Sequence, residues 1–225
     1  MFSSQTPAIT KSERTRAQIR EVALRSFRVR GYDGTTIRLI AEEAGVSVGT
    51  TNYHFASKNH LVQELYLDVQ RAHRDAAEPL LTASDDLIER LRIVYSSGLD
   101  QLEPYHAFAP EFLSAAVSPR SPINPLSEES APAMAIIQAL FREAVDGASD
   151  KLPDEFRDRL PQVFVLAHLL LALFWVYDRS PDRRRTRALL DRGLRLLKLA
   201  LPLTRLPLLR APLREMLDLV SEVRS

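Results

Sequence analysis

The amino-acid sequence predicts an all-α protein, and three observations lead to this fold class. Apolar residues recur at the three- and four-residue spacing of amphipathic helices, in long segments that prolines separate. No Asn-Gly or Asp-Gly pair lies between two runs of alternating polarity, so β-hairpins are not indicated. Four of the seven glycines fall within residues 31–49, where we therefore expect tight turns between short helices.

The predicted helices begin at recognisable capping residues. Thr10 and Glu13 have the spacing of a capping box at the start of the first helix. Thr35 or Thr36 can cap the second helix, and Ser47 can cap the third. Helices are expected over residues 12–30, 37–44, 49–55, 58–77, 85–102, 108–116, 132–145, 153–177 and 181–201.

The charge of the chain is unevenly distributed. The 225 residues are 45% hydrophobic and 26% charged, which suits one large or two small globular domains with a sizeable core. The net charge is only +1, but residues 1–60 hold nine Lys or Arg against five Asp or Glu. The front of the chain is therefore basic and the remainder acidic, and this asymmetry favours a polyanionic partner for the N-terminal part.

Composition and spacing exclude several classes of site. Without cysteine the chain has no disulfide, no thiol nucleophile and no Cys-ligated metal. His73 and His106 lack a partner at metal-ligand spacing, so we expect neither a metal nor a cofactor. The N-terminus has no signal-peptide pattern, and the most apolar stretch, residues 163–177, is shorter than the roughly 20 residues that span a bilayer. We expect a soluble, cytoplasmic protein.

Two short predicted helices are joined by the segment AGVS at residues 44–47. This matches the helix-turn-helix arrangement, whose second helix lies in the major groove of DNA. An amphipathic first helix precedes the motif, and a set of residues surrounds it at fixed spacing: Phe27, Gly31, Tyr32, Thr36, Ile40, Ala41, Ala44, Gly45, Val46, Ser47, His54, Phe55, Ser57, Lys58 and Leu61. In these residues, all in register, residues 12–72 resemble the N-terminal domain of the TetR family of bacterial transcription regulators.

The resemblance implies a DNA-binding surface on the second and third helices. Its expected members are Thr36, Arg38, Val48, Gly49, Thr50, Asn52, Tyr53, His54 and Lys58. Arg38 can reach a guanine edge or grip a phosphate, and Asn52 has the donor and acceptor that read adenine. Tyr53, His54 and Lys58 are expected to bond phosphates. The alternative for Thr36 is a helix cap alone, and for His54 a hydrogen bond to the local backbone.

One pair of residues departs from the common pattern of the family. Thr51 and Asn52 stand where a Leu-Tyr or Ile-Tyr pair is usual. A core leucine is thus replaced by threonine, and an aromatic residue that would contact DNA is replaced by an amide. The expected fold is unchanged, but the base preference of other family members does not carry over to this chain.

An enzyme is the competing interpretation of the same region. Residues 45–49, GVSVG, satisfy the G-x-S-x-G pattern of a hydrolase nucleophile elbow, with Ser47 as nucleophile. An elbow follows a β-strand, whereas the preceding residues are predicted to be helical. We therefore interpret Ser47 as a helix cap and expect no enzymatic activity.

The resemblance also implies how the chain divides. We expect an N-terminal arm at residues 1–11, the DNA-binding domain at 12–72, and a helical effector-binding and dimerisation domain at 73–225. The last long helix carries an apolar stripe, which with residues 163–177 can form a four-helix interface between two copies. The stripe consists of Leu190, Leu194, Leu197 and Leu201. The alternative is that it serves the core of a single copy.

The second domain is rich in aromatic residues and predicts an apolar or aromatic small-molecule effector. The residues expected to bind it are Phe108, Phe112, Phe164, His168 and Trp175; His168 has the alternative of a satisfied core histidine. We thus expect a dimeric repressor that a small molecule releases from a palindromic, double-stranded DNA operator. The alternatives are an activator on the same fold and, from the Arg183–Arg185 run and the leucine-rich helices, a protein that binds membrane surfaces.

Overall fold

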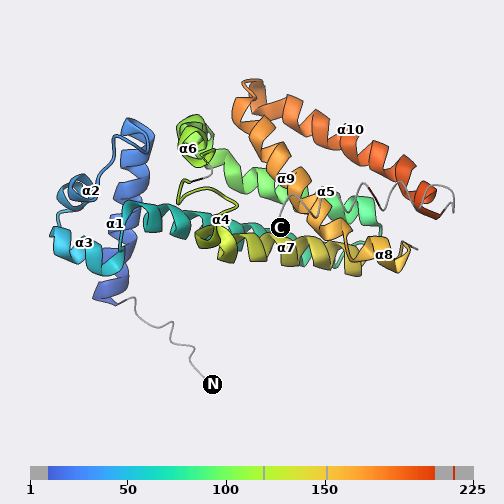
Figure 1. Ribbon diagram of the computed structural model, residues 1–225, viewed down its shortest axis with the longest axis horizontal. Helices are drawn as coiled ribbons and strands as arrows, with labels where there is room; N and C mark the ends of the chain where they lie inside the picture. Colours follow the sequence, from blue (N-terminus) through green and yellow to red (C-terminus); the bar gives the residue numbers. More distant parts are fainter. Residues whose placement is uncertain (1–9, 119, 151, 206–214, 216–225) are drawn as a thin grey trace, which may run out of the picture. The chain divides into compact units, whose positions relative to one another are not determined.

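The computed structural model describes residues 10–118, 120–150, 152–205 and 215, and these residues contain helices and no β-strand (Figure 1). The predicted all-α fold is therefore confirmed, while most of the expected N-terminal arm lies outside the described residues. The α-helices are α1 Lys11–Arg30, α2 Ile37–Glu43, α3 Val48–His54, α4 Lys58–Leu81, α5 Leu87–Leu102, α6 Ala109–Ala116, α7 Ala131–Asp146, α8 Asp154–Arg157, α9 Leu160–Tyr177 and α10 Arg184–Ala200.

The predicted helix starts in the N-terminal part are confirmed by their caps. At α1 the backbone N–H of Glu13 donates to the Thr10 hydroxyl at 3.2 Å, and the Glu13 carboxylate accepts from the Thr10 backbone at 2.7 Å. The hydroxyls of Thr36 and Ser47 accept backbone N–H groups at the starts of α2 and α3, at 3.2 and 2.9 Å. Gly45, in the turn between α2 and α3, has a φ of 64°, which favours glycine.

Two predicted helices are interrupted in the structure. The helix expected over 153–177 is divided into α8 and α9, and Pro161, which has no backbone N–H to donate, stands in the first turn of α9. The helix expected from residue 181 begins as a 3₁₀ turn, Pro181–Arg183. Asp182 and Arg183 have φ values of 50° and 52°, so the regular helix starts only at Arg184.

The chain forms two packing units. Of the residues that the structure describes, those within 1–65 and 107–129 form the first unit, and those within 66–106 and 130–225 form the second. The domain boundary at residue 72 stays a prediction, and the packing places α6 and the following loop with the N-terminal helices. The ring of Phe112 on α6 meets that of Phe27 on α1 edge to face at 5.3 Å, and this contact is part of what holds α6 in the first unit.

The first unit has an apolar core formed by residues of α1 and α2 and by the residue that follows α3. Ile19, Phe27, Ile40 and Phe55 are each at most 1% exposed. Ile40 on α2 and Phe55 just after α3 are both fully buried there. Such short helices are unstable in isolation, so the core and their caps determine where they lie.

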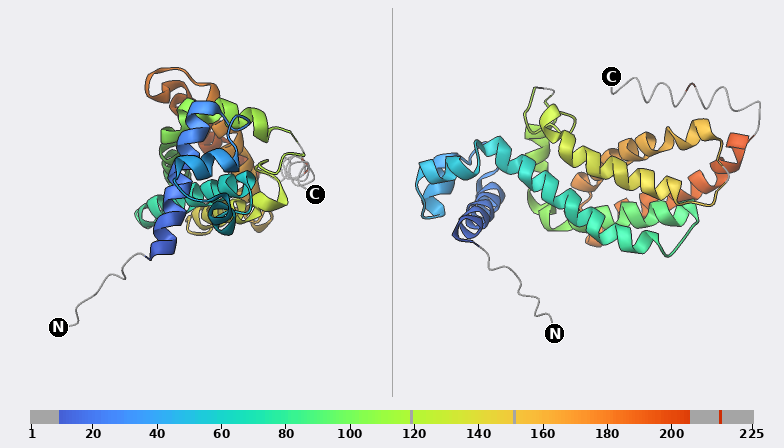
Figure 2. Two further views of the ribbon diagram at one scale, coloured as in Figure 1. Left: turned by 90° about the vertical axis from the view of Figure 1, so that its left-hand side faces the viewer. Right: turned by 90° about the horizontal axis from the view of Figure 1, so that it is seen from below.

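The second unit is a helical bundle. Helix α5 packs against α7 and α10, and α9 packs against α7 and α10; Figure 2 shows these helices gathered into one bundle. Its core includes Leu91, Val94, Leu140 and Phe141, each at most 1% exposed.

A buried carboxylate organises the connection between α9 and α10. Asp178 accepts hydrogen bonds from the backbone N–H and hydroxyl of Ser180, at 2.9 and 2.6 Å, and from those of Thr186, both at 2.8 Å. Burial alone would raise the pKa of Asp178, but these four bonds outweigh it and hold the pKa well below its usual range. The carboxylate thus ties the start of α10 to the end of α9.

Candidate DNA-binding surface

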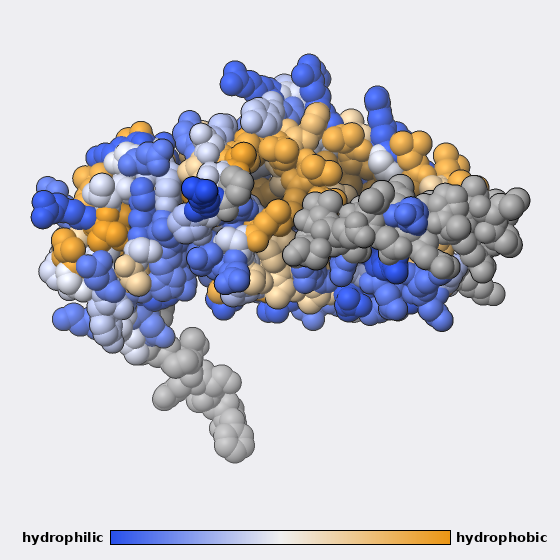
Figure 3. Space-filling view, viewed as in Figure 1, coloured by the Kyte–Doolittle hydropathy of each residue, from blue (hydrophilic) through white to orange (hydrophobic). Residues whose placement is uncertain are grey.

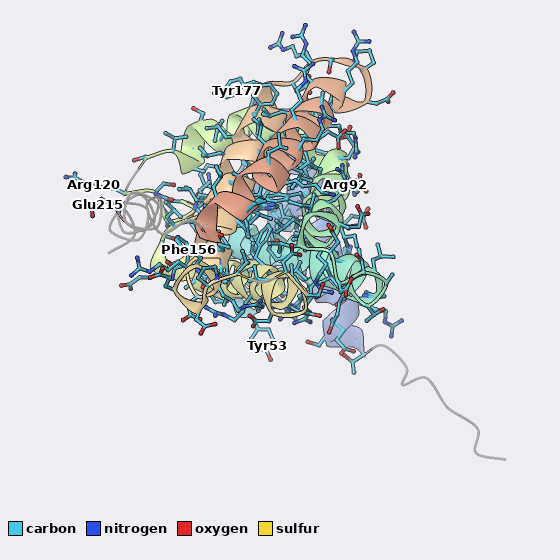
Figure 4. All side chains as sticks on the ribbon, turned by 90° about the vertical axis from the view of Figure 1, so that its right-hand side faces the viewer. Tyr53, Arg92, Arg120, Phe156, Tyr177 and Glu215 are labelled. Carbon is cyan, nitrogen blue, oxygen red and sulfur yellow. The ribbon has the colours of Figure 1, made fainter. Side chains whose placement is uncertain are left out.

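The face of α3 that was predicted to read DNA is open to solvent. Val48, Gly49, Asn52 and Tyr53 are exposed, and Thr50 and His54 are half-buried. Tyr53 is 83% exposed, and its side chain stands clear of the ribbon in Figure 4. A helix that exposes an aromatic ring and an amide beside a glycine can present them to a groove without first rearranging its own core.

The start of α2 adds two exposed residues, Thr36 and Arg38. The Thr36 hydroxyl accepts the backbone N–H of Leu39, so its capping role is established. A phosphate contact by Thr36 stays a prediction, as does base reading by Arg38.

The buried face of α3 explains the unusual Thr51. Its side chain is fully buried, and its hydroxyl donates to the carbonyl of Ser47 at 3.2 Å. A threonine can therefore replace the common core leucine because its polar atom finds a partner within the helix. The hydroxyl of Ser47 accepts a hydrogen bond from the backbone N–H of Thr50 at 2.9 Å, which is the geometry of a helix N-cap.

Lys58, at the start of α4, is engaged inside the first unit. Its ammonium donates to the carbonyl of Tyr32 at 2.7 Å and lies 3.9 Å from the centroid of the Tyr32 ring. Burial lowers the pKa of Lys58, although the nearby charge of Asp33 opposes the shift. Lys58 therefore ties α4 to the turn after α1, a role that the sequence did not indicate, and its phosphate contact stays a prediction.

The five residues expected to line one effector pocket lie in separate clusters. Phe108 and Phe112 belong to the first unit, where their rings lie 5.6 Å apart and the guanidinium of Arg28 lies 5.2 Å from the Phe108 ring. Trp175 belongs to the second unit, where it meets His106 edge to face at 4.7 Å and donates its Nε1–H to Glu103 at 3.3 Å. Phe108 and Phe112 thus pack on α1, and ligand binding by the five residues stays a prediction.

Phe164 and His168 lie in the interior of the second unit, in a cluster that also contains Tyr95 and Phe141. The hydroxyl of Tyr95 donates to the carbonyl of Phe164 at 3.0 Å. Burial, reinforced by the neighbouring His73, lowers the pKa of His168 from 6.5 to about 3. His168 is therefore neutral at physiological pH.

Two histidines stack against each other in this interior. The rings of His73 and His168 lie 5.6 Å apart at an interplanar angle of 18°, and Nε2 of His73 donates to the Val94 carbonyl at 2.8 Å. Gly98 makes room for the pair, because a Cβ at this position would lie 2.8 Å from Cε1 of His168 and 2.9 Å from Cε1 of His73.

The apolar stripe expected at a dimer interface instead lies largely inside one copy of the chain. Leu190 and Leu194 on α10 are 8% and 3% exposed, and Leu197 and Leu201 are half-buried. Leu190 and Leu194 are buried within one protomer, where α10 packs against α5 and α9, and a part for the stripe in a dimer interface stays a prediction. The alternative, that the stripe serves the monomer core, describes them correctly.

A different set of apolar side chains on α9 and α10 is exposed. Figure 3 shows hydrophobic residues gathering over these two helices. The exposed members are Leu170, Leu173, Phe174 and Tyr177 on α9, Leu189, Leu196 and Leu199 on α10, and Leu203 just after it. We call this set the exposed leucine face. On α10 Leu189 and Leu196 stand one heptad apart beside the buried stripe, and this second leucine series is the sequence signal for the exposed face.

The length and composition of residues 154–177 would also allow them to cross a membrane. The core helix of a soluble protein meets the same criteria, and α9 packs against α7 and α10. The structure therefore adds only weak support for a membrane span.

Comparison with known families accounts for most of the chain. Residues 19–65 match the model of bacterial regulatory proteins of the tetR family, and residues 90–223 match the model of the tetracyclin repressor-like C-terminal domain. The chain belongs to the TetR family. The resemblance inferred from the N-terminal residues is thus confirmed, and it extends to the C-terminal helices.

Several TetR-family regulators are similar to the chain in sequence. The transcriptional repressor KstR2 of Mycobacterium tuberculosis is 34% identical over 96 residues, which cover 41% of this chain and 46% of the relative. The regulator TtgR of Pseudomonas putida is 40% identical over 81 residues, covering 36% and 38%. The aligned segments thus span less than half the length of these curated relatives.

The solved structures agree with the fold. The crystal structure of a TetR-family regulator from Syntrophomonas wolfei aligns with a TM-score of 0.68 and 15% identity, covering 84% of this chain and 97% of that one. The chain is accordingly a TetR-family transcriptional regulator with a helix-turn-helix DNA-binding domain, and this family is not enzymatic. Ser47 caps α3, and the hydrolase interpretation is set aside.

Proposed function

We propose that this TetR-family regulator is a cytoplasmic, dimeric repressor that binds a palindromic DNA operator through α3 and leaves it when a small molecule binds the second unit. The observation that carries the proposal is the exposed polar and aromatic face of α3, held by the capped α2–α3 motif. The basic N-terminal sequence supports a nucleic-acid partner, and the similarity to the transcriptional repressor KstR2 supports repression.

The exposed residues divide by the DNA group that each suits. Arg38 and Asn52 have bidentate polar groups for base edges, and Val48 offers a methyl contact to thymine. Gly49 and Thr50 permit close approach of the helix to the groove. The phosphate contacts are assigned to Thr36, Tyr53, His54 and Lys58, of which Lys58 keeps donors beyond the one used by the Tyr32 carbonyl.

Selection of bound DNA from a random pool tests this assignment. The parent protein should enrich a palindrome. Arg38→Ala and Asn52→Ala should each relax the base preference at one position per half-site and weaken operator binding by about 1–3 kcal/mol. Arg25→Ala is the matched control, since Arg25 is an exposed α1 residue whose guanidinium pairs with Glu21. If binding to every DNA sequence weakened equally, Arg38 or Asn52 would be a phosphate contact. If the parent enriched no sequence, the proposal that α3 reads DNA would be contradicted.

The dimer is proposed to form through the exposed leucine face. Two apolar helices, α9 and α10, are exposed on one protomer, and a second copy can cover them as a four-helix interface with two-fold symmetry. Two recognition helices then lie about one DNA turn apart, which is the requirement for reading a palindrome.

The effector is proposed to be an apolar or aromatic small molecule. The aromatic interior of the second unit supports this, because Tyr95 and Phe141 lie against His168 there and Phe164 lies against Phe141. A ligand that binds better to the conformation with misaligned recognition helices lowers the population that can bind DNA. The ligand can shift this equilibrium only by as much as its affinities for the two conformations differ.

Thermal unfolding in the presence of apolar and aromatic compounds tests the sensor role. A compound at 100 times its dissociation constant should stabilise the protein by about 2.7 kcal/mol, and the same compound should release the operator. Stabilisation without operator release would identify a ligand that is not an effector. No stabilisation across a broad library would contradict a small-molecule sensor.

A further inference from the structure

Helix α1 bonds to the C-terminal ends of both short helices of the DNA-binding motif. The Nη1 of Arg16 donates to the carbonyl of His54, the last residue of α3, at 2.7 Å. The Nε2 of Gln18 donates to the carbonyl of Ala44, which ends α2, at 2.8 Å. A helix leaves its last carbonyls without partners in the helix, and a cation there also interacts favourably with the helix dipole. The Arg16 side chain therefore satisfies a group that α3 cannot satisfy itself.

The Arg16 guanidinium is held on two further sides. Its Nη2 lies 2.9 Å from Oε2 of Glu64 on α4, and its central carbon lies 4.4 Å from the centroid of the Phe55 ring. Phe55 is fully buried, so its ring is a fixed surface for the guanidinium. One side chain on α1 thus connects the end of α3 with α4. The planar fork of arginine suits these simultaneous contacts, whereas a lysine ammonium is a single point charge.

We propose that Arg16 is a positioning residue that sets the orientation of α3 and thereby the base selectivity of the protein, without itself contacting DNA. The proposal rests on the function proposed above. Helix α3 has seven residues and little surface of its own to determine its tilt. Bidentate contacts to base edges depend on that tilt, whereas flexible side chains can still reach phosphates when the tilt of α3 changes.

The first test is Arg16→Met, which removes the guanidinium and keeps an apolar stem. The affinity for the selected operator should fall about tenfold, since a hydrogen bond to a charged group is lost. The affinity for unrelated DNA and its dependence on salt should not change, because both reflect phosphate contacts. Arg25→Met is the matched control on the same helix, and its ratio of operator to unrelated-DNA affinity should equal that of the parent.

Two further variants separate positioning from charge. Arg16→Lys restores the positive charge but should only partly restore selectivity, because an ammonium does not reproduce the fork. Glu64→Gln should reduce selectivity in the same direction as Arg16→Met, since the guanidinium loses its ionic partner. If Arg16 instead gripped a phosphate, Glu64→Gln would remove a competing negative charge and strengthen DNA binding. Both variants keep most of the packing and remain informative should Arg16→Met fail to fold.

Three results would overturn the proposal. A salt slope that falls by about one in Arg16→Met would make Arg16 a phosphate contact. Full rescue by Arg16→Lys would show that only its charge matters. Lowered thermal stability with unchanged selectivity below the unfolding temperature would leave Arg16 a purely structural role. A parent protein that selects no DNA sequence would contradict the proposed function itself, and this result is distinct from the other three.

Discussion

The double variant Leu196→Arg with Leu199→Arg is expected to be monomeric and to bind the operator about 10²- to 10⁴-fold more weakly than the parent. Both leucines belong to the exposed leucine face, at 68% and 73% exposure. Arginine at these positions is solvated in the monomer but would be buried without a partner in a dimer, which costs several kcal/mol. A monomer engages one half-site at a time and loses the high effective concentration of the second recognition helix.

Sedimentation velocity and operator titration on the same samples measure this effect. Ala135→Arg with Ala139→Arg is the matched control, because these α7 residues are exposed and give the same change in charge outside the exposed leucine face. Leu194→Arg offers a contrast: its leucine is buried in the protomer, so this variant should unfold the second unit rather than dissociate the dimer. A proven monomer with undiminished operator affinity would contradict the dimer proposal. Binding of the parent, but not the double variant, to anionic vesicles would favour the membrane-surface alternative.

Arg90→Met is expected to destabilise the second unit by about 3 kcal/mol or more. Arg90 lies on α5 and is only 6% exposed. Its guanidinium donates to the carbonyls of Glu143 and Ala144 in the last turn of α7, both at 2.8 Å. It also donates to the carbonyls of Leu81, the last residue of α4, and Ser84. Methionine matches the length of the stem but removes all four of these donations, and of the four carbonyls that of Glu143 keeps the backbone N–H of Gly147, at 3.0 Å.

Denaturant unfolding followed by circular dichroism measures this destabilisation. The control is Arg92→Met, on the same helix, whose guanidinium is paired with Asp191 and Glu89 nearer the surface. Exposed ion pairs contribute little, so Arg92→Met should cost less than about 1 kcal/mol. Equal effects of the two substitutions, or an Arg90→Met protein as stable as the parent, would show that the buried carbonyls find other partners.

Local signals predicted the helix starts of the DNA-binding motif well. The caps at Thr10, Thr36 and Ser47 act within three residues of themselves, so their geometry depends little on the rest of the chain. The same holds for the exposed face of α3, because Thr51 and Phe55 must point inward and the helical period then places Asn52 and Tyr53 outward.

The contacts made over long distances in the sequence were not predicted. Lys58 was assigned to DNA, yet its ammonium bonds the Tyr32 carbonyl, 26 residues away. Arg16 bonds the carbonyl of His54, 38 residues away, and nothing in its local pattern distinguishes it from the other arginines of α1. Such pairs depend on how helices cross, which the spacing of residues within one helix does not specify.

The sequence by itself determined the helical fold, the family of the N-terminal domain and the face of α3 that meets solvent, because helical periodicity and capping are local properties. Only the tertiary structure decided which of the two leucine series of α10 is buried and that α6 packs with the first unit. Periodicity shows that a helix has apolar sides. Which side the rest of the chain covers depends on where the neighbouring helices pack, and for α10 they cover Leu190 and Leu194 and leave Leu196 and Leu199 exposed.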